Sequence, residues 1–163
     1  MDRLITLAAA DALTAGLTRL ATESVPLRHA MGRTLAVPLL ADRPFPPYRR
    51  AMMDGIAFAA DRLPATGPLL LDGLQAAGDP PPREGRAWEI MTGAVVPDAC
   101  DTVVPYEDFE QGRPRPGFQK GQYIHHPGSD ARAGDILVAS GAAIGPVELA
   151  IAASVGATSL EVF

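Results

Sequence analysis

Glycine and proline interrupt the chain so often that long regular elements have little room. The sequence has 16 glycines and 16 prolines among its 163 residues, together well above the share of roughly 12% in an average protein. Proline lacks a backbone N–H, and glycine adopts conformations that other residues avoid, so both favour turns. The sequence therefore predicts short strands joined by turns rather than long helices.

Charge and cysteine content narrow the class of protein. The net charge is −5 and 47% of the residues are hydrophobic, which allows a sizeable core and argues against a nucleic-acid or anionic-membrane partner. The single cysteine, Cys100, rules out an internal disulfide and a cysteine-based zinc cluster. No apolar run approaches the roughly 20 residues of a membrane span. We expect a globular, cytoplasmic protein with no nucleic-acid and no membrane partner.

The N-terminal part of the chain carries two helical patterns. Residues 6–21 read as one amphipathic helix, with Thr6 as its N-cap. Leucines at the spacing of one helix face form an apolar stripe, made by Leu13, Leu17 and Leu20. A strand entry and a short helix around Arg28–Leu35 follow, and prolines then keep the backbone extended.

The C-terminal part predicts a helix and a final strand. Pro146 stands at a first helical position, Glu148 lies in the first turn, and Gly156 marks the end. Residues 158–163 then read as a strand, and the two ends of the chain are expected to pack together.

The middle of the chain has a β pattern. Short strands are expected within residues 55–60, 68–74, 87–94, 101–109 and 122–126, with a polar loop at 76–87. We therefore predict an α+β protein. A β-rich, barrel-like domain (48–132) is inserted into a small elongated α/β domain (1–47 plus 133–163) that carries an N-terminal amphipathic helix.

The stretch RRAMMDGIAF (49–58) has two interpretations. Asp54 and Gly55 predict a tight turn in which glycine takes a positive φ and the aspartate bonds its own backbone. Alternatively, Asp54 is a carboxylate placed for chemistry. The preceding Arg49 and Arg50 either bind an anion or form a solvated surface pair.

Two further stretches hold candidate site residues. In IMTGAVVPDACDTVVPYED (90–108), Thr92 can offer a hydroxyl to a phosphate, and Gly93 lets a ligand approach the backbone. Glu107 belongs either to a site or to a charged loop. In YIHHPGSDARAGD (123–135), adjacent histidines point to opposite faces of a strand, so we assign no metal site there. Asp130 lies at a cleft edge or in a turn.

Taken in order, these stretches resemble the N-terminal part of the molybdopterin molybdenumtransferases, the family that includes the gephyrin E domain. The segment PFPPYRRAMMDGIAF (44–58) is similar to the family pattern P-x-F-x-N-S-A-M-D-G-Y-A. The segments IMTGAVVPDACDTVVPYE (90–107), HHPGSDARAGDILV (125–138) and GAAIGPVELAIAASVG (141–156) resemble three later family motifs in the same order.

The resemblance implies a function in molybdenum cofactor biosynthesis. The family inserts molybdate into adenylylated molybdopterin, releases AMP and uses a divalent metal such as magnesium. By motif matching, the catalytic positions here are Asp54, Thr92 and Asp130. The remaining matched positions are expected to bind cofactor, and they are Gly55, Gly93, Glu107 and Arg50.

The resemblance also has gaps. The family's Asn-Ser is replaced by Arg50-Ala51, its tyrosine by Ile56, and its glutamate by Ser129. The family's cofactor-binding domain has no counterpart in these residues. We therefore expect that residues 1–163 are not catalytically competent alone. They act in trans with a separate molybdopterin-binding domain, or as a scaffold, and form a homodimer. The alternative is a non-catalytic protein-binding module that keeps only the fold.

Overall fold

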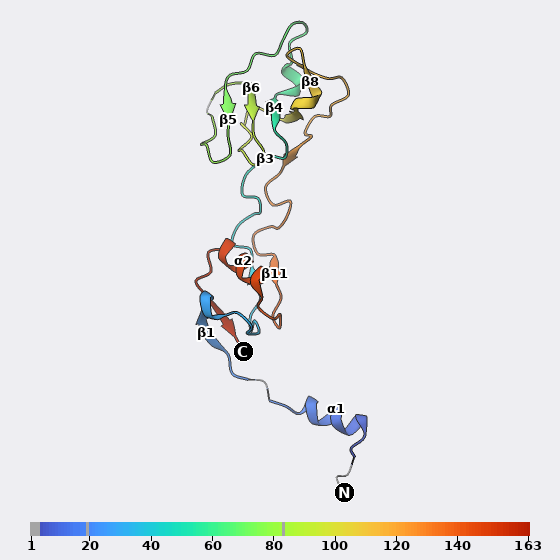
Figure 1. Cartoon of the computed structure of the whole chain (residues 1–163), viewed down its shortest axis with the longest axis vertical. Coiled ribbons are helices and arrows are strands. Elements are labelled where there is room, and N and C mark those ends of the chain that lie inside the picture. The colour runs from blue at the N-terminus through green and yellow to red at the C-terminus, as the bar shows by residue number, and fades with distance from the viewer. Residues whose placement is uncertain (1–3, 19, 83) are drawn as a thin grey trace. The chain divides into compact units, whose positions relative to one another are not determined.

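The computed structural model describes residues 4–18, 20–82 and 84–163. The chain forms two compact units (Figure 1). The first, here called the terminal unit, takes Met1–Leu40 and Ile136–Phe163, and the second, the central unit, takes Ala41–Asp135.

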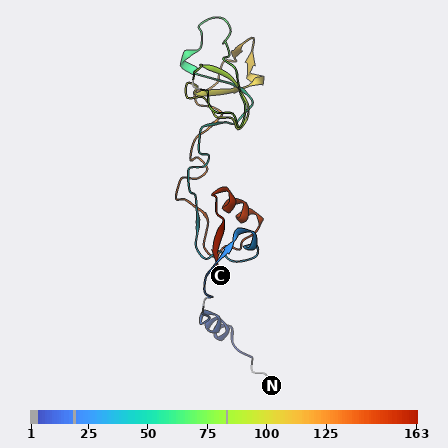
Figure 2. The same ribbon diagram turned by 90° about the vertical axis from the view of Figure 1, so that its left-hand side faces the viewer.

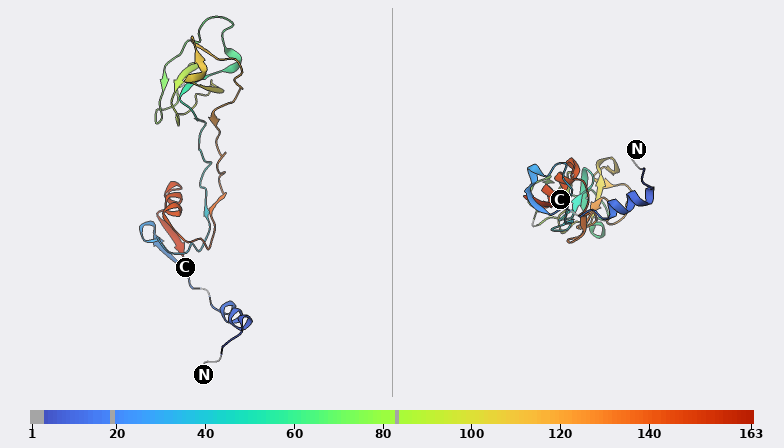
Figure 3. Two further views of the ribbon diagram at one scale, coloured as in Figure 1. Left: turned by 45° about the vertical axis from the view of Figure 1, so that its right-hand side comes forward. Right: turned by 90° about the horizontal axis from the view of Figure 1, so that it is seen from below.

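The terminal unit joins the two ends of the chain through paired strands. Strand β1 (Glu23–Pro26) runs antiparallel to β12 (Ser159–Val162), so the predicted final strand is confirmed. Figure 3 shows these two strands side by side. A second pair joins β2 (Leu39–Leu40) to β11 (Ile136–Val138). Apolar side chains of this unit form one cluster: Ala30, Leu35, Val138, Ile144, Ala152, Leu160 and Val162.

The predicted C-terminal helix is confirmed as α2 (Pro146–Ser154), seen beside the paired strands in Figure 2. Its N-terminus is capped because Glu148 Oε2 accepts a bond from Gly145 N at 2.8 Å, which satisfies a donor that the helix leaves unpaired. Ala152 is fully buried and anchors the helix to the apolar cluster. The chain leaves the helix before Gly156, which has a φ of 73°.

The N-terminal helix is shorter than the sequence predicts. Helix α1 spans Leu7–Ala15, and Thr6 caps it as expected by accepting a bond from Ala9 N at 3.2 Å. Gly16 ends it, so the prediction of a helix to residue 21 is wrong. The predicted stripe is wrong for the same reason, because Leu17 and Leu20 lie beyond the helix that carries Leu13. No residue of α1 is buried, and without packing a short helix has little to oppose fraying at a glycine.

The predicted helix at 28–35 is also wrong. Only a 3₁₀ turn, η1 (Leu27–His29), forms there. Gly32 then takes a φ of 77°, a conformation incompatible with helix, and its N–H donates to Ile144 O at 2.8 Å. Leu35 N donates to Ala142 O at 2.9 Å. Backbone bonds to a distant segment therefore prevail over the local helical pattern.

The central unit is built on a four-stranded sheet in the order β5–β6–β4–β7. The strands are β5 (Leu74–Gln75), β6 (Ala87–Ile90), β4 (Gly55–Phe58) and β7 (Thr102–Pro105). Every residue of β4 and β7 is buried, because the sheet packs a separate apolar cluster on each face. A strand covered on both faces reads as a continuous apolar run, as GIAF and TVVP do.

Shorter elements complete this unit. Strand β3 (Arg50–Ala51) pairs with β10 (Ile124–His125). A hairpin joins β8 (Phe109–Glu110) to β9 (Arg113–Pro114). Two 3₁₀ turns also occur, η2 (Ala60–Arg62) and η3 (Tyr106–Asp108).

The predicted strand at 68–74 is wrong except for Leu74, the first residue of β5. The fold is α+β and mostly β, as predicted; the barrel-like shape of the middle remains a prediction.

Candidate functional site

A single backbone segment, residues 49–55, runs between the stretches that carry the predicted site residues. On one side, Ala51 N donates to Ala94 O at 2.9 Å. On the other side, Met52 N donates to Tyr123 O at 3.0 Å. The segment is therefore fixed by backbone bonds to both neighbours, and its side chains can reach residues on either one.

Asp54 is held by Thr92. Asp54 Oδ1 accepts the backbone N–H and the hydroxyl of Thr92, each at 2.6 Å. Both side chains are exposed. The two bonds lower the pKa of Asp54, the hydroxyl bond more than the backbone bond. Among the described residues, none donates to Oδ2, so this oxygen can meet a ligand from outside the unit.

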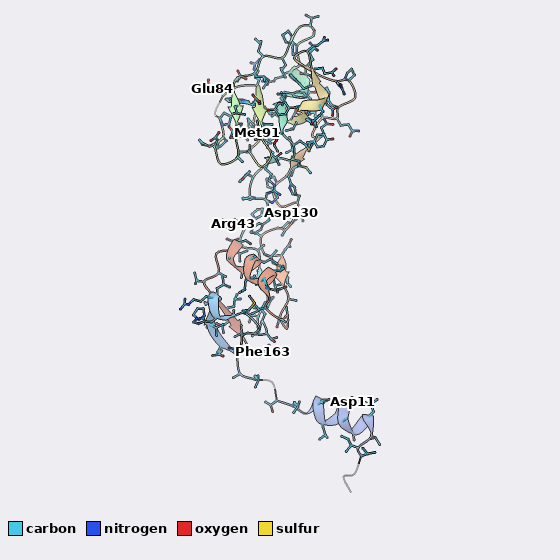
Figure 4. The ribbon with its side chains drawn as sticks, viewed as in Figure 1. Asp11, Arg43, Glu84, Met91, Asp130 and Phe163 are labelled. Atoms are coloured by element: carbon cyan, nitrogen blue, oxygen red, sulfur yellow. The ribbon has the colours of Figure 1, made fainter. Side chains whose placement is uncertain are left out.

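A tight turn presents Thr92 to Asp54. Ala94 N donates to Met91 O at 3.0 Å, which closes a four-residue turn with Gly93 in its third position. Gly93 has a φ of 84°, which a turn of this kind requires and which glycine adopts at little cost. Figure 4 labels Met91, the residue before Thr92, at the end of β6. The Thr-Gly pair thus serves to aim a hydroxyl and an N–H.

Gly55 has a different role from the predicted one. It is not a positive-φ turn residue but the first residue of β4. A Cβ at this position would lie 1.9 Å from Val104 O, so only glycine fits against β7. The expectation that Asp54 bonds its own backbone is also wrong, since its side chain reaches across to Thr92. Close backbone approach, not turn geometry, requires the glycine.

Arg50 and Asp130 lie at a second cluster, joined by His125. Arg50 Nε and Nη2 donate to His125 Nδ1 at 3.2 and 3.0 Å. His125 Nε2 lies 2.8 Å from Asp130 Oδ1. Arg50 Nη2 is 4.0 Å from Asp130 Oδ2. The strand register explains this, because Arg50 and His125 are opposite each other in the β3–β10 pair.

The two arginines of the segment have separate tasks. Arg49 Nη1 donates to Cys100 O at 3.0 Å, and Arg49 Nη2 donates to Pro97 O at 2.9 Å. Its guanidinium therefore fixes the turn before β7 and is not available as an anion-binding partner of Arg50. Of the two arginines, only Arg50 contacts the cluster of His125 and Asp130.

Tyr106 and Glu89 form a further contact that the sequence analysis missed. Tyr106 N donates to Asp54 O at 3.3 Å, and Tyr106 Oη donates to Glu89 Oε1 at 2.5 Å. Partial burial of the phenol and the Glu89 carboxylate raise the pKa of Tyr106 to about 12. Glu107 follows Tyr106 in η3 and is exposed. The structure therefore brings Asp54 next to Thr92 and the backbone of Tyr106, and Arg50 next to His125 and Asp130.

The donor set bears on metal binding. Within residues 4–18, 20–82 and 84–163, no three His, Cys, Asp or Glu side chains gather to hold a metal ion. Asp54 Oδ2 is a single hard oxygen donor, which suits Mg²⁺, since that ion keeps several waters and takes few protein carboxylates.

Both α-helices have nine residues, and no helix in the described part of the chain could cross a membrane.

Comparison with known proteins identifies the family. The family model described as "MoeA N-terminal region (domain I and II)" matches residues 5–156 of this chain. The chain belongs to the MoeA family. This finding confirms the resemblance seen in the four ordered motifs, and it covers both structural units.

Named MoeA relatives agree with this assignment. The chain is 35% identical over 142 residues to the molybdopterin molybdenumtransferase of Synechocystis sp., covering 80% of this chain and 36% of that protein. It is 35% identical over 160 residues to the molybdopterin molybdenumtransferase of Synechococcus elongatus, covering 88% and 39%. The chain thus spans less than two fifths of the length of these relatives.

A solved MoeA structure has the same fold over most of the chain. The molybdopterin biosynthesis moeA protein of Pyrococcus horikoshii OT3 superposes with a TM-score of 0.75 at 27% identity. The superposition covers 87% of this chain and 41% of that protein.

Proposed function

We propose that residues 1–163 act in molybdenum cofactor biosynthesis as the N-terminal part of a molybdopterin molybdenumtransferase. In this proposal they work in trans on a molybdopterin-binding domain that lies outside residues 1–163. The reaction is the insertion of molybdate into adenylylated molybdopterin, with release of AMP. Family membership supports the pathway, and the geometry around Asp54 supports a direct part in the chemistry.

The observation that carries the proposal is the pair of bonds from Thr92 to Asp54 Oδ1. They hold the carboxylate in place and favour its charged form. Among the described residues, none donates to Oδ2, which is therefore open to a ligand. Asp54 and Thr92 are exposed and belong to neither apolar cluster of the central unit. In this proposal the exposed carboxylate would meet the molybdopterin-binding domain.

Magnesium and molybdate fit this arrangement in different ways. Asp54 would hold Mg²⁺ as one carboxylate among water and phosphate ligands, and the ion would neutralise negative charge on the reacting groups. Molybdate is an anion and needs donors. Arg50 offers guanidinium N–H groups for an oxyanion, while Gly93 lets a ligand approach the turn.

Complementation tests this proposal. A strain that lacks molybdopterin molybdenumtransferase receives residues 1–163 together with a separately expressed molybdopterin-binding domain from a relative. We expect molybdoenzyme activity to return with both parts and not with either alone. Asp54→Asn should abolish the rescue, while Asp98→Asn, an exposed carboxylate on another turn, should not. Failure of the combined arm would contradict action in trans.

A second candidate is a non-catalytic protein-binding or scaffold module. One observation favours it: α1 has no buried residue, and Leu13 is 66% exposed, which is unusual for an apolar face without a partner. Full rescue by Asp54→Asn, with loss of rescue when the helix is changed, would favour this role.

A further inference from the structure

We infer that His125 is a positioning residue that orients the Asp130 carboxylate, and that Arg50 fixes the His125 tautomer required for this. The inference rests on the proposed function for its effect on the reaction, but not for its geometry. The side chains of Arg50, His125 and Asp130 form a hydrogen-bonded series. Arg50 and His125 come from two paired strands, and Asp130 comes from the turn that follows the second strand.

The tautomer follows from the donors. A guanidinium has N–H groups and no acceptor, so His125 Nδ1 must accept when Arg50 Nε and Nη2 lie 3.2 and 3.0 Å from it. Nδ1 therefore carries no proton, and the ring proton is on Nε2. That N–H donates to Asp130 Oδ1 at 2.8 Å. The ring therefore bridges the guanidinium of Arg50 and the carboxylate of Asp130 through its two nitrogens.

Backbone hydrogen bonds fix both Arg50 and Asp130, the two outer residues of this series. Arg50 and His125 are partners in the β3–β10 register. Ser129 N donates to His126 O at 3.2 Å, and Gly128 has a φ of 73°. Pro127 and Gly128 thus occupy the positions that such a turn favours. Asp130 N is anchored to Phe45 O at 2.9 Å. Figure 4 labels Asp130 in the stretch that follows β10.

The direct ion pair is the weaker link. Arg50 Nη2 and Asp130 Oδ2 are 4.0 Å apart, and their side chains are 42% and 54% exposed, so water screens the attraction. The side chain of His125 is only 23% exposed and sits between them. A short bond from a partly buried ring orients a carboxylate better than a long, solvated ion pair. The histidine is therefore the group that sets where Asp130 points.

A nitrogen spectrum tests the tautomer without any activity measurement. A long-range proton–nitrogen correlation spectrum of isotope-labelled protein is recorded at about pH 8, where a free imidazole is neutral. We expect His125 to carry its proton on Nε2, with assignment by loss of the signals in His125→Leu. Arg50→Ala should shift the Nδ1 signal, whereas His126→Gln, a change in the adjacent exposed histidine, should not. A proton on Nδ1, or a chemical shift of Nδ1 that is the same in Arg50→Ala as in the wild type, would overturn the inference.

Activity with the molybdopterin-binding domain tests the positioning role. His125→Leu should lower kcat about tenfold, as loss of an orienting partner commonly does. His125→Gln keeps one donor and one acceptor and should retain more activity than His125→Leu, while His126→Gln should match the wild type. Equal rates for the glutamine and leucine variants would overturn the positioning role. If the wild type itself shows no activity, the proposed function fails, and the tautomer assignment stands or falls by the spectrum alone.

Discussion

Thr92 gives both its backbone N–H and its hydroxyl to one oxygen of Asp54, each at 2.6 Å. The two residues are far apart in the sequence, and the contact forms because a tight turn after β6 lies beside the segment that leads into β4. The bonds leave the second carboxylate oxygen for a ligand. The proposed function depends on this relationship.

Thr92 should control the pKa of Asp54. Thr92→Val removes the hydroxyl bond, the larger of the two causes that lower the pKa, and should raise the pKa part of the way to its ordinary value of 3.8. The backbone bond remains and prevents full recovery. Thr92→Ser keeps both bonds and should leave the pKa unchanged. The carboxyl carbon signal of Asp54, followed by NMR from acid to neutral pH, measures this.

The lowered pKa of Asp54 determines the direction in which folding stability changes with pH. The folded state holds the charged form better than the unfolded state does. The stabilisation is therefore present above the ordinary pKa and is lost as the pH falls through the folded-state pKa. Thr92→Val should weaken this acid dependence. An unchanged pKa in that variant would mean that the hydroxyl bond is not formed in solution.

Two glycines near the site should respond differently to alanine. Gly55→Ala places a Cβ 1.9 Å from Val104 O, and the clash with backbone should lower the free energy of unfolding by roughly 3 kcal/mol or more. Gly93→Ala meets only Ala77 Cβ at 3.8 Å, so its cost is the positive φ, about 1 kcal/mol. Urea unfolding measures both. Equal effects would contradict the close-approach explanation for Gly55.

Glu89 should contribute to the high pKa of Tyr106. Burial of the phenol is the first cause of the rise to about 12, and the bond and charge of Glu89 come next. Glu89→Gln should therefore lower the pKa of Tyr106 only part of the way to 10.0. Because the raised pKa favours the neutral phenol, its stabilisation is present below 10.0 and is lost as the pH rises through about 12. Tyrosinate absorbance reports the titration, with Tyr106→Phe as the reference.

The exposed leucines of the N-terminal segment should matter for association, although only Leu13 lies in α1 and Leu17 follows the end of the helix. Leu13 and Leu17 are 66% and 74% exposed, and we propose that they bury each other in a homodimer. Leu13→Glu with Leu17→Glu should shift the sedimentation coefficient to that of a monomer. The control is Thr14→Glu with Thr18→Glu, which adds the same charge at the residues that follow Leu13 and Leu17 in the sequence. No change in the leucine variant would exclude this dimer contact.

The sequence predicted the elements whose signals are local. Pro146 and Glu148 mark the start of α2, and Thr6 marks the start of α1, because capping depends on neighbouring residues. The prediction of a helix at 28–35 failed because backbone bonds from Gly32 and Leu35 to a distant segment set the conformation there.

The same reason limits prediction of the site. The sequence shows Asp54 and Thr92 as separate candidates, and only the strand pairing brings them together. The sequence tests His125 only for metal binding and gives no site there, because adjacent histidines point to opposite faces of a strand. A test of which strand position faces Arg50 would have found it, but the register of two-residue strands leaves no periodic signal in the sequence.

Molybdate-dependent release of AMP is the most direct test of the central claim. Purified residues 1–163 are mixed with a molybdopterin-binding domain loaded with adenylylated molybdopterin, and AMP is measured with and without molybdate. We predict release that needs both proteins and molybdate, that falls at least about a hundredfold in Asp54→Asn, and that persists in Asp98→Asn. Release unchanged by Asp54→Asn, or no release from the complete mixture, would contradict the proposed function.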